Sequence, residues 1–195
     1  FSLQEVHSSV GCVGPMAAVV HDLNIFFVSE WGIYTTDGLN VRNISEPVIP
    51  DLWGTVNQEY LHKACLTVWD EKVRIDLPTG TSEENDLTLF YDPKNNAFWP
   101  MDSINASCYT TYNDGTGSGF KLYTGDNVQG YVNEQDTGTE DFGTAISAYW
   151  QGKYFDMGIP EVEKKARKIF LQDSPDTTET VDLAISTDYD DYVDL

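Results

Sequence analysis

Short runs of hydrophobic residues, some continuous and some alternating with polar residues, extend along most of this chain and are separated by tight turns. Between Pro15 and Pro47 four such runs follow one another, at residues 17–20, 25–28, 33–36 and around Val41. Asp37-Gly38 joins the last two runs, and Asp-Gly is a strong β-hairpin signal because both residue types tolerate positive φ. The stretch predicts four antiparallel strands, the size of one β-propeller blade.

The strand expected at residues 73–77 has the clearest alternation. Val73, Ile75 and Leu77 fall on one face, and Arg74 and Asp76 fall on the other. A period of two places successive side chains on opposite faces of a sheet. We therefore expect a half-buried strand whose hydrophobic side chains point inward and whose charged side chains point outward.

An internal repeat connects this strand with others. The second strands of successive units begin at Asn24, Lys72 and Phe120, spaced by 48 residues, and Lys168 falls on the same spacing. Units of about 40 to 50 residues with four strands each are typical of propellers. The sequence thus predicts an all-β, propeller-like fold of four-stranded antiparallel blades. With three blades and part of a fourth, the propeller is incomplete unless missing sequence or a partner chain closes it.

The expected domain organisation follows from this repeat. Residues 1–160 form the propeller-like region, and residues 161–195 add strands that complete or flank the last blade, ending in an acidic tail. A further strand is expected at residues 1–9, and a connector with one helical turn at residues 46–56. The blades are expected at about residues 16–45, 61–103 and 106–150. In the second blade, strands are expected at residues 64–69, 73–77, 87–91 and from 97 onward, with turns at residues 70–71 and 92–96. In the third blade, strands are expected at residues 107–112, 120–123 and 128–133.

The first residues of the chain do not have the pattern of a signal peptide. Phe1 is not an initiator Met, and no signal-peptide pattern follows it, so we expect a processed piece of a longer protein. No window approaches the roughly 18 consecutive apolar residues of a membrane span. We therefore expect no transmembrane segment.

Charge is the most unusual compositional feature. The chain has 32 acidic and 11 basic residues, a formal net charge of −21, which argues against binding nucleic acid by phosphate neutralisation. A strongly negative surface is compatible with DNA sliding past the protein without binding, and it also simply keeps a protein soluble. Four of the basic residues lie close together in the sequence: Lys164, Lys165, Arg167 and Lys168. They could contact an acidic partner, such as another copy of the chain, or they could form a solvated face.

The chain contains no recognisable catalytic motif. The alternating glycines at residues 115–119 do not form G-x-G-x-x-G, and Ser118 is not in a G-x-S-x-G elbow. The three histidines lack metal-ligand spacing. Glycoside hydrolysis needs only two carboxylates across a cleft, and 32 acidic residues give no way to choose a pair. We expect a protein that is not an enzyme.

Three other groups of residues are candidates for a site. Two acidic groups could offer oxygen ligands to calcium, although neither matches an EF-hand and each also fits a solvated loop. Widely spaced cysteines predict small hydrophobic side chains in the core. Tryptophans at strand ends either line a ligand surface or, as we expect, pack between blades. The residues are Asp188, Asp190 and Asp191; Asp136, Glu140 and Asp141; Cys12, Cys65 and Cys108; and Trp31, Trp53, Trp69, Trp99 and Trp150.

Several longer segments resemble tailed-bacteriophage virion proteins. The segments are SVGCVGP at residues 9–15, IFFVSEWGIY at 25–34, ISEPV at 44–48, LFYDPKNNAFW at 89–99, and AYW at 148–150 followed by FDMGIP at 155–160. They are similar to turn and hairpin sequences of propeller-like head–tail connector, nozzle and tail-hub proteins, akin to packaged-DNA stabilisation proteins. The match extends over most of the chain.

The resemblance implies a non-enzymatic structural component of a virion. Its partners would be other virion proteins and copies of itself in a ring around the DNA exit channel, and an acidic channel wall would let DNA pass without binding. The alternative is a carbohydrate-binding module on a tail or cell surface, with aromatic side chains as platforms for sugars. Neither interpretation requires a cofactor, and calcium is the one candidate ion.

Overall fold

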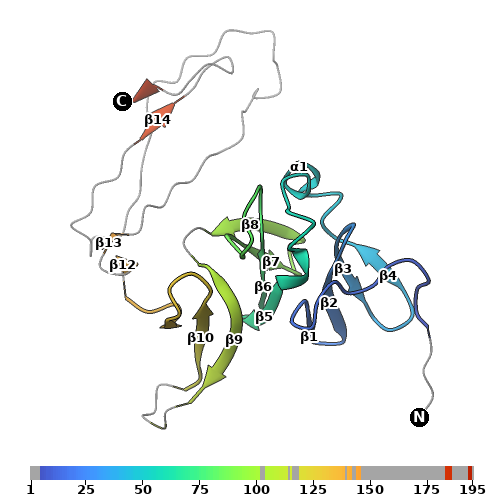
Figure 1. Ribbon diagram of the computed structural model, residues 1–195, viewed down its shortest axis with the longest axis horizontal. Helices are drawn as coiled ribbons and strands as arrows, with labels where there is room; N and C mark the ends of the chain where they lie inside the picture. The colour runs from blue at the N-terminus through green and yellow to red at the C-terminus, as the bar shows by residue number, and fades with distance from the viewer. Residues whose placement is uncertain are drawn as a thin grey trace. The chain divides into compact units, whose positions relative to one another are not determined.

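The computed structural model describes residues 5–101, 104–113, 115, 119–138, 140–141, 144–145, 183–185 and 193–194. The chain divides into two units, Phe1–Ile146 and Ser147–Leu195, and the predicted boundary at residue 160 lies outside the described residues. The first unit contains two four-stranded sheets and one three-stranded sheet, all antiparallel (Figure 1). The predicted all-β class is therefore confirmed.

The first sheet follows chain order through β1 (Ala18–His21), β2 (Asn24–Ser29), β3 (Gly32–Thr36) and β4 (Val41–Asn43). Its last connection is the predicted Asp-Gly turn. Gly38 has a φ of 88°, and the Asp37 carboxylate accepts hydrogen bonds from the backbone N–H groups of Leu39 and Asn40 at 2.8 and 2.7 Å. Aspartate accepting from the backbone two residues on stabilises such turns.

The second sheet repeats this order through β5 (Cys65–Trp69), β6 (Lys72–Leu77), β7 (Leu87–Asp92) and β8 (Ala97–Met101). Asp70 and Glu71 both have positive φ, 49° and 59°, which is the backbone of a two-residue hairpin that matches strand twist. Asn96, in the turn before β8, has a φ of 49°. The predicted strands and turns of this sheet are confirmed.

The third sheet has the order β11-β10-β9, formed by β9 (Ala106–Tyr112), β10 (Lys121–Asp126) and β11 (Val132–Glu134). The strand predicted at residues 128–133 begins later, because β10 continues to Asp126 and its carboxylate caps the turn. Its Oδ1 accepts from the backbone N–H groups of Val128 and Gln129 at 2.8 and 2.5 Å. Two short hairpins are also described: β12 (Glu140–Asp141) with β13 (Thr144–Ala145), and, in the second unit, β14 (Ala184–Ile185) with β15 (Val193–Asp194).

The segments around the first sheet differ from expectation at one point. The predicted helical turn is α1 (Pro50–Trp53), and a 3₁₀ segment, η1 (Leu61–Lys63), follows before β5. The strand expected at residues 1–9 is wrong for residues 5–9, which are exposed and form no strand. Val6 is the only hydrophobic residue among them, so a strand there would bury almost nothing.

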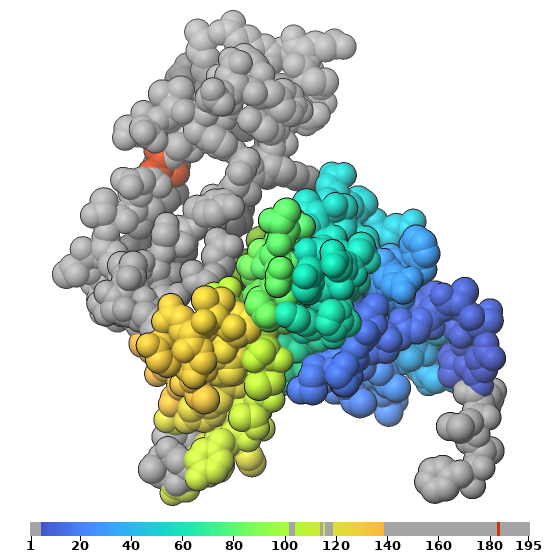
Figure 2. Space-filling model, in the orientation of Figure 1, coloured from blue at the N-terminus to red at the C-terminus, as the bar shows by residue number. Residues whose placement is uncertain are grey.

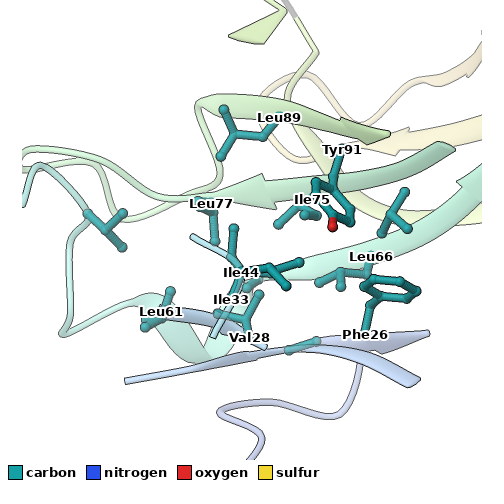
Figure 3. Close-up of a cluster of buried hydrophobic side chains, with 14 residues drawn as sticks. Phe26, Val28, Ile33, Ile44, Leu61, Leu66, Ile75, Leu77, Leu89 and Tyr91 are labelled. Carbon is teal, nitrogen blue, oxygen red and sulfur yellow. The ribbon is translucent and has the colours of Figure 1, made fainter. Parts of the chain in front are cut away.

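The hydrophobic core lies between the first and second sheets. Figure 3 shows Val28 and Ile33 of the first sheet directed toward the side chains of the second sheet. Each fully buried aliphatic or aromatic side chain contributes roughly 1.5–3 kcal/mol relative to exposure. The core consists of Ala17, Phe26, Val28, Ile33, Ile44, Val56, Leu61, Ala64, Leu66, Val73, Ile75, Leu77, Leu89 and Tyr91.

Arg74 and Asp76 correct the expectation of a half-buried β6. Val73, Ile75 and Leu77 face the core as predicted, but Arg74 and Asp76 are only 2% and 0% exposed. The third sheet packs on the face that was expected to meet solvent. Both faces of β6 are therefore buried, one in an apolar core and the other in a polar interface.

The first strands of the three sheets lie next to one another, with β5 between β1 and β9 (Figure 1). Leu66 of β5 donates its backbone N–H to the carbonyl of Met16, just before β1, at 2.9 Å. On the other side, Cys65 Sγ donates to the carbonyl of Ala106, the first residue of β9, at 3.4 Å. The first strand of the second sheet is thus in contact with the first strands of both other sheets.

Candidate functional site

The polar interface between the second and third sheets is centred on Asp76. The Asp76 Oδ1 atom and the Thr88 hydroxyl, on paired positions of β6 and β7, are 2.5 Å apart. Thr88 Oγ1 also lies 3.1 Å from the carbonyl of Ile104. A hydroxyl has one hydrogen, so it cannot donate to both acceptors. A protonated Asp76 can donate to Thr88 while Thr88 donates to Ile104, whereas an ionised Asp76 accepts the hydrogen bond from Thr88.

Two further side chains contact the Asp76 carboxyl. Cys65 Sγ lies 3.7 Å from Asp76 Oδ2, and the buried Tyr109 phenol of the third sheet lies near the same carboxyl group. Burial raises the pKa of Asp76 to about 7, against the opposing effects of hydrogen bonds and of the nearby Arg74 charge. Burial also raises the pKa values of the Cys65 thiol and the Tyr109 phenol. The thiol therefore stays protonated and is not a nucleophile.

Amide side chains join the same two sheets. Asn85, in the loop before β7, donates through Nδ2 to the carbonyls of Ala106 and Lys63 at 2.8 and 2.9 Å. Asn127, after β10, donates through Nδ2 to the carbonyl of Asn85 at 3.1 Å. These directional bonds hold the third sheet in one orientation on the second.

Arg74 connects this interface with solvent. Its Nη2 donates to Asp136 Oδ2, and its guanidinium carbon lies 4.7 Å from the centre of the Phe90 ring. The Arg74 side chain is 3% exposed, whereas that of Asp136 is 42% exposed. The Nε and Nη1 groups of Arg74 are buried and have no hydrogen-bond partner among the described residues. The guanidinium therefore retains unused donor capacity, which is costly in a buried position.

An open hollow of about 250 Å³ lies beside Arg74. The Phe90 and Trp99 rings, paired across β7 and β8, are parallel within 6° with centres 6.2 Å apart. Lys72 Nζ contacts Asp70 Oδ2 at 3.0 Å. We call this hollow the aromatic cleft; it is lined by Trp69, Asp70, Lys72, Arg74, Phe90, Trp99 and Asp136. Figure 2 shows the second sheet (green) in direct contact with the third (yellow-green to yellow).

The predicted site residues have different outcomes. Lys164, Lys165, Arg167 and Lys168 lie outside the described residues, as do Asp188, Asp190, Asp191 and Trp150. Asp136, a calcium candidate, is paired with Arg74, and the side chains of its proposed companions Glu140 and Asp141 are not described. Among the described residues, no group of three His, Cys, Asp or Glu side chains could hold a metal ion.

The cysteine and tryptophan expectations are partly wrong. Cys65 is buried, but Cys12 and Cys108 are exposed, so only one of the three belongs to a packed interior. Trp53 packs against the core as expected, whereas Trp31 is 67% exposed and Trp69 and Trp99 line the cleft. The cleft itself was missed, because its arginine and aromatics belong to separate strands. The register signal in LFYDPKNNAFW, which pairs Phe90 with Trp99, was the available clue.

Comparison with known proteins adds no assignment. No protein-family model matches the sequence, and no curated protein matches it significantly. Neither helical segment in the described part of the chain is long and apolar enough to cross a membrane. The class that fold and site define is an all-β protein of stacked antiparallel sheets with a polar interface and an open aromatic cleft.

Proposed function

We propose that this chain is a non-enzymatic structural component of a tailed-phage virion, at the head–tail connector, nozzle or tail hub. Its sheets act as blades of an incomplete propeller that assembles with copies of itself and with other virion proteins around the DNA exit channel. The virion assignment rests on the sequence resemblance of the turn and hairpin segments.

The observation that carries the propeller interpretation is the adjacency of β1, β5 and β9, the first strands of three successive sheets. In a propeller, each four-stranded blade packs face to face on the next around a central channel. The second strands of the sheets begin at Asn24, Lys72 and Lys121, which supports a repeated unit. The third sheet has three described strands.

The net charge of −21 supports a role beside DNA without attachment to it. Lys and Arg side chains that neutralise phosphates supply most of the affinity of non-specific DNA binding. An excess of carboxylates instead repels the duplex and prevents it from adhering. The protein would then line or border a passage through which DNA moves.

The mass of the protein in solution tests the assembly. We expect native mass spectrometry and electron microscopy to show a closed ring, and Arg167→Glu to weaken it because the basic run at residues 164–168 contacts an acidic neighbour. Arg42→Glu, a matched change at an exposed residue of β4, should leave assembly unchanged. A protein that stays monomeric at every concentration contradicts the ring.

DNA binding is the second test. Fluorescence anisotropy with a labelled duplex at moderate salt should show weak binding or none, because the surface is strongly negative. Tight binding under these conditions contradicts the acidic-channel proposal. A ring that also binds DNA tightly would contradict the proposal that DNA passes without binding, but not the proposal that the protein assembles as a ring. The two measurements therefore test the two proposals separately.

A further inference from the structure

The aromatic cleft has a composition that the structural role does not require. Trp99 remains 36% exposed although its neighbour Phe90 is buried, so one aromatic surface is available to a ligand. Aromatic rings bind the C–H-rich face of a flat, partly polar molecule through dispersion and through their quadrupole. Binding pockets commonly combine such surfaces with a few fixed polar groups.

The charges around the cleft exclude a strong preference for an ion. Two carboxylates, Asp70 and Asp136, face two cations, Lys72 and Arg74, and each carboxylate is paired with one cation. A charged ligand would have to compete with these pairs. A neutral ligand rich in hydroxyl groups can instead donate to the carboxylates and accept from the cations without disrupting them.

The unused donors of Arg74 are an independent indication of a ligand. Only 3% of its side-chain surface is exposed, yet its Nε and Nη1 groups have no hydrogen-bond partner among the described residues. Arg74 lines the cleft, but these two donors have almost no accessible surface, so a bound molecule reaches them only when the side chain shifts toward the cleft. Such a shift would pair donors that are costly to leave unpaired.

We propose that the aromatic cleft binds one ring of a neutral saccharide, with the ring's apolar face on Trp99 and its hydroxyls toward Asp70, Arg74 and Asp136. The cleft volume of about 250 Å³ suits a single ring, so the rest of an oligosaccharide would extend into solvent. This site goes beyond the proposed structural role, and neither depends on the other.

The test is a titration of the full chain with glucose, galactose, N-acetylglucosamine and their β-linked tetramers, followed by calorimetry and by ligand-observed NMR. Glucuronic acid and glucosamine serve as anionic and cationic comparators. At least one neutral sugar should bind, and its tetramer should bind no worse than the monomer. Failure of every neutral sugar, or tighter binding of a charged comparator, overturns the proposal.

Tryptophan variants locate the site. Trp99→Ala should weaken binding by about tenfold or more, and Trp99→Phe by less, because a smaller aromatic face remains. Trp31→Ala is the matched control: it removes a tryptophan that is 67% exposed in the turn between β2 and β3, outside the cleft, and should leave affinity unchanged. Circular dichroism checks that each variant is folded. Binding that survives Trp99→Ala, or that Trp31→Ala abolishes, contradicts the site.

Discussion

Asp76 and Thr88 are cross-strand neighbours on β6 and β7, and their side-chain oxygens lie 2.5 Å apart in a fully buried position. The second short contact of the Thr88 hydroxyl, with the Ile104 carbonyl, is compatible with a single hydroxyl hydrogen when Asp76 is protonated. The interface between the second and third sheets is therefore built around a neutral carboxylic acid at mildly acidic pH.

This arrangement predicts a pH dependence of stability. The pKa of Asp76 is raised from 3.8 to about 7 in the folded protein, chiefly by burial, so the folded state holds a proton that the unfolded state releases. Its stabilising contribution is complete below the unfolded pKa and is lost as the pH rises through the folded pKa. Between about pH 5 and about pH 8, the unfolding free energy should fall by about 2–3 kcal/mol relative to Asp76→Asn, measured by urea denaturation.

Asp37 provides the control for this measurement. Backbone hydrogen bonds from Asn40 and Leu39 lower the pKa of its exposed carboxyl group, so its contribution is lost only as the pH falls through that lowered value. The stability difference between the parent protein and Asp37→Asn should therefore stay constant between about pH 5 and about pH 8. An Asp76→Asn difference that is equally constant contradicts the prediction.

The Arg74–Asp136 pair predicts unequal effects of removing each partner. Asp136→Ala leaves a buried guanidinium without its carboxylate and should destabilise the protein by about 2–3 kcal/mol. Arg74→Met leaves a carboxylate that is already 42% exposed and removes two unpaired donors, so it should cost less than about 1.5 kcal/mol. Chemical denaturation measures both, and equal costs contradict this interpretation of the pair.

The two glycines of the SVGCVGP segment should respond differently to alanine. A Cβ at Gly14 would lie 2.2 Å from the carbonyl oxygen of His62, whereas a Cβ at Gly11 would meet nothing within 4 Å. Because the obstacle at Gly14 is backbone, relief requires the chain to move. Gly14→Ala should lower the thermal midpoint by several degrees, and Gly11→Ala should leave it nearly unchanged; similar midpoints contradict the packing of this segment on η1.

The core between the first and second sheets predicts a matched pair of hydrophobic deletions. Ile75 is fully buried, so Ile75→Ala should destabilise by about 2–5 kcal/mol through lost burial and a residual cavity. Leu23, in the turn between β1 and β2, is 91% exposed, and Leu23→Ala should change stability by less than about 0.5 kcal/mol. A small effect at Ile75, measured in guanidinium chloride, contradicts face-to-face packing of the two sheets.

Local signals predicted most elements of the first two sheets. The alternation around Ile75 placed β6, and the Asp37-Gly38 and Asn95-Asn96 pairs placed two turns, because positive φ and side-chain capping are properties of a few adjacent residues. The third sheet was predicted less well. The limit of β10 depends on how Asp126 caps its turn rather than on alternation.

The sequence by itself thus determined the all-β class, the strands of the first two sheets and the strongly acidic character of the protein, since each depends on local pattern or on composition. Only the tertiary structure decided that Arg74 and Asp76 are buried, because the outer face of β6 is covered by a sheet that begins thirty residues after Asp76, at Ala106. It also decided that Asp136 meets Arg74, a contact 62 residues apart in the chain. Alternation predicts which residues share a face, but what covers that face depends on how whole sheets pack.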